Sequence, residues 1–174
     1  MTRRQRLRRV ALLCCHCLRN LAFYKAGWRN RALLRGDQFW VTANGNFLDI
    51  CVLEWCKLFA DSRGKHYWRK LITDPDKFQS ELLARLHLAE TEFQAYTEKM
   101  RAYRDKFVAH LDTEEVMHIP ILRTARQSAS FLYEYILHHE NEGDIFHDAP
   151  QSASTFYRLF FEEGKVAYTA DTAT

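Results

Sequence analysis

The chain has 174 residues, which suits one domain with a sizeable hydrophobic core, and we predict a single helical domain over residues 1–174 with frayed tails at 1–6 and 169–174. A hydrophobic share of 47% and an aromatic share of 14% exclude a disordered chain, and only six Gly and three Pro predict few turns and long helices. The net charge of +3 is mild, and the basic excess lies close to the N-terminus.

The first predicted helix covers about residues 4–25, because apolar residues recur near heptad spacing at Leu7, Val10, Cys14, Cys17, Leu21 and then Trp28. Its start is crowded with arginines, namely Arg3, Arg4, Arg6, Arg8 and Arg9. Such a cluster suits nucleic acid or an anionic surface, but a solvated first turn with a frayed tail explains it at least as well. An exported leader does not fit, because His16 interrupts the apolar stretch and no small-x-small cleavage site follows it. We therefore expect a cytoplasmic protein.

The cysteines lack the spacing of a disulfide framework. Their number is odd, and they stand at Cys14, Cys15, Cys17, Cys51 and Cys56. We interpret them as reduced core thiols of a cytosolic protein. Adjacent positions on a helix point about a hundred degrees apart, so Cys14-Cys15-His16-Cys17 cannot converge on one zinc ion without breaking the helix.

Start signals and apolar spacing place the remaining helices. Asp37 can cap the second helix, although Asn44-Gly45-Asn46 is expected to kink or split its middle. Asp74-Pro75 starts a long helix or a broken pair, and Pro120 starts another helix. The helices expected after the first cover about residues 38–61, 65–72, 75–110, 120–139 and 152–163.

The fold class follows from this pattern. Strand-like alternation is absent, β-branched residues are few, and no apolar run without charges is long enough to cross a bilayer. We predict an all-α protein, an irregular helical bundle of about five to seven helices, with no membrane partner.

The most informative segment is 103–112, at the end of the helix expected over 75–110. An Arg holds a phosphate by a planar two-point hydrogen bond and keeps its charge, and a His exchanges a proton near neutral pH. Arg104 and His110 are therefore a minimal set for cleaving a phosphodiester without a metal. On an ideal helix, however, their side chains lie about 120° apart and about 9 Å along the axis. The simpler interpretation is that Arg104 pairs with a nearby carboxylate and His110 caps the helix end.

The segment Arg104-Asp105-Lys106-Phe107-Val108-Ala109-His110 resembles the Arg-(polar)-x4-His motif of the HEPN superfamily, small all-helical proteins that include RNA-cutting toxins. Residues 46–61 also resemble the helix that precedes the motif helix in abortive-infection members, so the likeness covers about residues 38–140. The sequence departs from one branch at Asp112, where that branch carries a Tyr that a partner nucleotidyltransferase modifies.

The resemblance implies a HEPN-like fold and a metal-independent endoribonuclease, a toxin or antiviral (abortive-infection) effector. Such an enzyme would cut RNA at a site shared across a homodimer. His110 would act on the ribose 2′-OH or the leaving 5′-oxygen, and Arg104 would bind the phosphate. Asp105 would orient Arg104 or an imidazole, and Lys106 stands beside them. A cognate antitoxin is a further expected partner, and no metal or other cofactor is expected. The alternatives are a catalytically inactive HEPN-like protein that binds nucleotide, RNA or a protein partner, and an unrelated helical interaction protein.

Two weaker patterns have simpler interpretations. His138-His139-Glu140 with His147-Asp148 offers metal-ligating side chains, but a polar helix end explains the first three better. The tryptophans have side chains that could stack on bases, but large aromatic residues at helical spacing are more often part of a core. They are Trp28, Trp40, Trp55 and Trp68.

Overall fold

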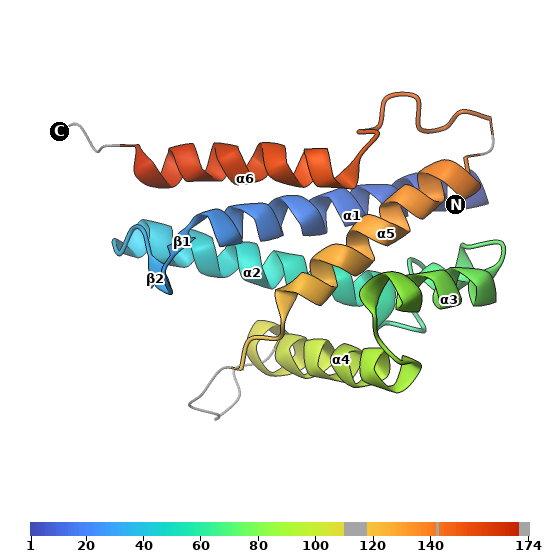
Figure 1. The fold of residues 1–174 in the computed structure, drawn as a ribbon, viewed down its shortest axis with the longest axis horizontal. Coiled ribbons are helices and arrows are strands. Elements are labelled where there is room, and N and C mark those ends of the chain that lie inside the picture. The colour runs from blue at the N-terminus through green and yellow to red at the C-terminus, as the bar shows by residue number, and fades with distance from the viewer. Residues whose placement is uncertain (110–117, 142, 171–174) are drawn as a thin grey trace.

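The computed structural model describes residues 1–109, 118–141 and 143–170. Within these ranges the chain forms an irregular bundle of six α-helices, which confirms the predicted all-α class (Figure 1). The helices are α1 (Arg3–Ala26), α2 (Gln38–Phe59), α3 (Pro75–Leu86), α4 (Glu90–Tyr103), α5 (Leu122–His139) and α6 (Ala153–Thr169). The smaller elements are β1 (Trp28–Arg29), β2 (Ala32–Leu33), the 3₁₀ turn η1 (Trp68–Lys70) and the π-helix η2 (Arg104–Ala109).

Helix α1 forms the centre of the bundle. Figure 1 shows it between α6 and α2, with α5 running across α1 at an angle. Its predicted apolar stripe is buried at Leu7, Val10, Cys14, Cys17 and Leu21. Trp28 does not continue this stripe, because the helix ends at Ala26 and the indole is 40% exposed in β1. All five cysteines are free thiols, and four of them are buried, in agreement with the sequence.

The start of α1 is more ordered than the sequence suggested. Thr2 caps the helix, since its hydroxyl accepts the amide of Gln5 at 3.2 Å and the Gln5 side chain accepts the amide of Thr2 at 2.9 Å. The side chain of Arg3 forms an ion pair with Glu140, which is 2% exposed. Residues 3–6 therefore belong to the helix. The prediction that residues 1–6 form a frayed tail is wrong for these four residues.

Helix α2 is continuous over Gln38–Phe59, so the split expected at Asn44-Gly45-Asn46 is wrong. Asp37 caps it as predicted, accepting the amide of Trp40 at 3.4 Å. Asn44 is buried, and its Nδ2 donates to the carbonyl of Tyr24 at 3.0 Å. Tertiary hydrogen bonds thus satisfy the amide that would otherwise compete with the helical backbone.

A short hairpin joins α1 to α2 where the sequence predicted no strand. Trp28 pairs with Leu33 and Arg29 with Ala32 in an antiparallel register. The two residues between the strands, Asn30 and Arg31, have φ angles of 51° and 66°, which suit a tight two-residue hairpin turn. Strands of two residues are too short to produce an alternating pattern, so sequence periodicity could not reveal them.

The region 75–110 is a broken pair of helices, one of the two predicted alternatives. Asp74 caps α3 through the amide of Lys77 at 3.1 Å, and Pro75 is the first helical residue. His87 ends α3 in the left-handed conformation, with φ of 54°. The chain then turns into α4, which Figure 1 shows on the far side of α2 from α6. Among the helices described, none combines the length and the apolar character that crossing a membrane requires.

Candidate functional site

Helix α4 positions the motif by packing against α2. Its buried face consists of Tyr96, Met100 and Tyr103, spaced by four and three residues. The Tyr96 ring meets Trp55 edge-on, with centroids 5.3 Å apart. Toward the end of α4, Arg101 donates to the carbonyl of Ala60 at 2.7 Å. These contacts fix the rotation of α4 and with it the direction of the residues that follow.

Arg104 and Asp105 form the part of the predicted site that the structure describes best. The Nε of Arg104 donates to Oδ1 of Asp105 at 2.8 Å, and its Nη2 lies 2.8 Å from the same oxygen. The Arg104 side chain is 24% exposed. The hydrogen bond with Asp105 raises the pKa of Arg104, and the charges of Cys56 and Asp61 act in the same direction against desolvation. Asp105 thus holds the guanidinium in one orientation, next to α2.

The helix widens at the motif. The backbone of Arg104–Ala109 takes π-helical geometry directly after the last residue of α4. Such turns are rare and occur often at functional sites. The sequence-predicted residues Arg104, Asp105 and Lys106 all lie in this turn. His110 lies outside the described residues.

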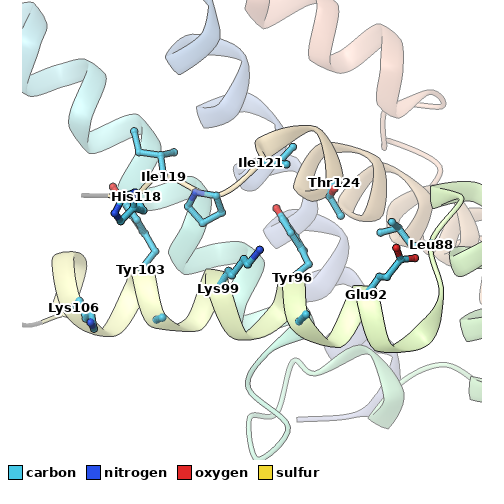
Figure 2. A pocket seen from close by; sticks show the side chains of 13 residues that line it. Leu88, Glu92, Tyr96, Lys99, Tyr103, Lys106, His118, Ile119, Ile121 and Thr124 are labelled. Atoms are coloured by element: carbon cyan, nitrogen blue, oxygen red, sulfur yellow. The ribbon is translucent and has the colours of Figure 1, made fainter. Parts of the chain in front are cut away.

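A groove of about 760 Å³ runs beside the motif, between α4 and the segment that leads into α5. Figure 2 shows Tyr96, Lys99 and Tyr103 projecting from α4 toward the segment 118–121. Of the predicted site residues that the structure describes, Lys106 alone lines the groove. The described part of the lining carries three basic or titratable nitrogen groups, from Lys99, Lys106 and His118, and one carboxylate, from Glu92.

His118 is the residue that sequence reasoning missed. It stands two positions before Pro120 and belongs to no recognised motif. The structure brings it to the groove because the chain returns to α4 before entering α5. The only signal in the sequence was the proximity of an imidazole to a helix start, which is too common to select a functional residue.

The weaker patterns take structural roles. Glu140 accepts the amide of Thr73 at 2.8 Å and its hydroxyl at 2.7 Å, besides pairing with Arg3, so it secures the bundle. Trp55 is fully buried and donates to the hydroxyl of Ser128 at 2.8 Å. Trp68 is also buried, so neither of these two indoles can stack on a base.

No protein-family model, curated protein or solved structure matches the chain. Over the described ranges, no group of three or more His, Cys, Asp or Glu side chains lies close enough together to hold a metal ion. What the arrangement offers is a fixed guanidinium, a carboxylate that orients it, and a groove with further nitrogen donors.

Proposed function

We propose that the chain is a metal-independent endoribonuclease of the HEPN type that acts as a toxin or antiviral effector on RNA. In this reaction His110 takes the proton of a ribose 2′-OH, and the 2′-oxygen attacks the adjacent phosphorus. The bond from phosphorus to the 5′-oxygen breaks, and the leaving oxygen receives a proton. The products are a 2′,3′-cyclic phosphate and a 5′-OH end. Arg104 stabilises the charge that develops on the phosphate.

The observation that carries the proposal is the held guanidinium of Arg104. A flexible arginine would lose side-chain entropy on binding a phosphate, whereas one that Asp105 already orients loses less. The contact is 2.8 Å long, and it lies in the π-helical turn that contains the motif. A partly exposed guanidinium can still present its remaining donors to a phosphate.

The adjacent groove supports an anionic substrate. Among the described residues, Lys99, Lys106 and His118 line it, and Glu92 contributes the one carboxylate. The two ammonium groups outnumber the carboxylate in this described part of the lining, and a low-dielectric cleft of one sign raises the local concentration of the opposite ion. Phosphates flanking the scissile bond would lie in this groove.

A two-fold dimer completes the proposed site. One Arg and one His that leave a helix about 120° apart form a poor site, whereas two copies facing one cleft supply both groups on each side of the phosphate. We expect the dimer contact to involve the outer face of α4 and η2, because their opposite face is committed to α2.

The test is cleavage of single-stranded RNA in the presence of EDTA. Arg104→Ala and His110→Ala should each abolish cutting, and the helical content measured by circular dichroism should not change. Arg63→Ala and His138→Ala are matched controls, since both side chains are exposed and lie outside the groove. Wild-type cleavage by His110→Ala would show that the assignment is wrong.

A second candidate is a HEPN-like protein that binds nucleotide, RNA or a protein partner and cuts nothing. The observation in its favour is the same contact, because a guanidinium that Asp105 holds by two nitrogens has fewer donors left for a phosphate. Asp105→Asn separates the two candidates. If Asp105 orients a catalytic Arg104, cutting should fall in this variant. If Asp105 competes with the ligand, binding should strengthen.

A further inference from the structure

A second groove lies along α5, apart from the one beside the motif. It has a volume of about 550 Å³ and is lined by side chains of α3, α5 and α6. A neighbouring hollow of about 680 Å³ continues it toward the end of α1. The two share the side chains of Arg126, Tyr157 and Phe161, so they form one continuous track, which we call the α5–α6 track.

The track is strongly cationic. Its basic side chains come from four helices, at Lys25, Arg85, Arg123, Arg126 and Arg158. Within 1–109, 118–141 and 143–170, none of these five forms an ion pair, whereas arginines elsewhere in the same ranges, such as Arg3 and Arg69, do. All five are exposed. Five like charges around one carboxylate, that of Glu134, repel one another and destabilise the fold, which makes the cluster informative about a ligand.

The one carboxylate in the track is already engaged. Glu134 lines the groove, and its Oε1 accepts the backbone amide of Ala153 at 3.2 Å, at the start of α6. This carboxylate therefore acts as a cap for the helix. Its single negative charge is shared with the start of α6 and is outnumbered by the five cations of the track.

Two aromatic rings lie along the same track. The rings of Tyr157 and Phe161 are nearly parallel, at 15°, with centroids 6.2 Å apart. The guanidinium of Arg126 lies 4.9 Å from the Tyr157 centroid, and the ammonium of Lys165 lies 5.6 Å from the Phe161 centroid. Both rings are half-buried, so part of each side chain is exposed to solvent. Cations and stacked rings in alternation are the features that bind single-stranded nucleic acid, because the cations meet phosphates and the rings meet bases.

We infer that the α5–α6 track binds a single strand of nucleic acid, with its phosphates on Arg85, Arg126 and Arg158 and its bases against Tyr157 and Phe161. A single strand fits better than a duplex, since the track is concave and offers no protruding helix or ribbon to enter a groove of B-DNA. It fits better than a mononucleotide, since the cations extend over two connected hollows. The choice of RNA as the natural strand rests on the proposed function.

The test measures binding to a single strand that cannot be cut. A 2′-O-methyl RNA of about ten nucleotides suits it, since the site size of such surfaces is about 4–16 nucleotides. Fluorescence anisotropy at several salt concentrations gives the affinity and its salt dependence. Arg126→Gln and Arg158→Gln should each weaken binding and each lower the slope of log K against log salt by about 0.7. Arg63→Gln removes the same charge from an exposed loop outside the track and should change neither quantity.

The aromatic contribution is tested separately. Tyr157→Ala and Phe161→Ala should each weaken binding at least about fivefold, with an unchanged salt slope, because stacking is not electrostatic. Circular dichroism confirms that each variant is folded. Tyr157→Phe, which keeps the ring, should bind like the wild type and supplies a second readout if the alanine variants are unstable.

Three outcomes would overturn the inference. Arg63→Gln could weaken binding as much as Arg126→Gln does, a duplex of the same sequence could bind as tightly as the single strand, or a mononucleotide could compete fully at equal phosphate concentration. Failure of the proposed function is distinguishable from these. Arg104→Ala should leave binding to the uncleavable strand within about twofold even though cutting is lost, because Arg104 does not line the track.

Discussion

The hydroxyl of Tyr103 donates to Oδ1 of Asp49 at 3.3 Å, and this contact ties the last residue of α4 to α2. Arg104 follows Tyr103 directly, so the direction in which its guanidinium leaves the helix depends on the anchor before it. Desolvation raises the pKa of Asp49, and the hydrogen bond from Tyr103 opposes that rise. The ionisation of the Asp49 carboxyl therefore depends on pH, and the same carboxyl accepts the hydrogen bond that positions the motif.

Asp49→Asn should make the protein more stable at neutral pH. A carboxyl whose pKa is raised on folding contributes stability that is fully present below its unfolded pKa, near 3.8, and is lost as the pH rises through the folded value. The amide has no ionised form to desolvate and still accepts from Tyr103. The gain should be no more than about 1 kcal/mol, since Asp49 is half-buried and water screens it. Urea unfolding from about pH 3 to pH 7 should show a difference that grows with pH. A constant difference would contradict this account.

Arg3→Ala should destabilise the bundle by about 1–3 kcal/mol, because it removes the charged partner of the buried Glu140 carboxylate. The two hydrogen bonds from Thr73 remain and limit the loss. Arg4→Ala is the matched control, since Arg4 is exposed on the same first turn. Equal denaturation midpoints for the two variants would show that the ion pair contributes nothing.

Substitution of alanine for glycine should have opposite effects on stability at Gly164 and at Gly45. A Cβ on Gly164 would lie 2.8 Å from the Cβ of Ala26 and 3.1 Å from Cδ1 of Phe23, so Gly164→Ala should force α6 away from α1 and cost about 1–3 kcal/mol. A Cβ on Gly45 meets nothing within 4 Å, so Gly45→Ala should stabilise α2 by about 0.5–1 kcal/mol. Thermal unfolding of both variants compares the two signs directly.

Arg104→Lys should reduce RNA cutting by about 100-fold or more, because an ammonium lacks the planar fork that a transition-state phosphate accepts. The double variant Arg104→Ala with His110→Ala should be little worse than either single variant, since groups that act as a unit are not additive. Single-turnover cleavage rates check both statements. Additive losses would indicate that the two residues act in separate steps.

The sequence by itself determined the α-helices and the location of the motif, although the helix expected over 65–72 is only the 3₁₀ turn η1. Asp37 and Asp74-Pro75 cap their helices through amides three residues away, and the stripe from Leu7 to Leu21 needs only the helical period to be recognised. These are local relationships, fixed within one or two turns of the chain. For the same reason the sequence could place Arg104, Asp105 and Lys106 at the end of a helix, where the structure has the π-helical turn.

Only the tertiary structure decided which polar side chains meet. Asn44 was expected to break α2, but it is buried and reaches the carbonyl of Tyr24 on α1. Glu140 was considered beside two histidines, and its partners prove to be Arg3 and Thr73, more than 60 residues earlier in the chain. The arginines of the α5–α6 track likewise come from separate helices. Such convergence depends on how helices pack, and packing is set by the whole core, so no spacing along the chain records it.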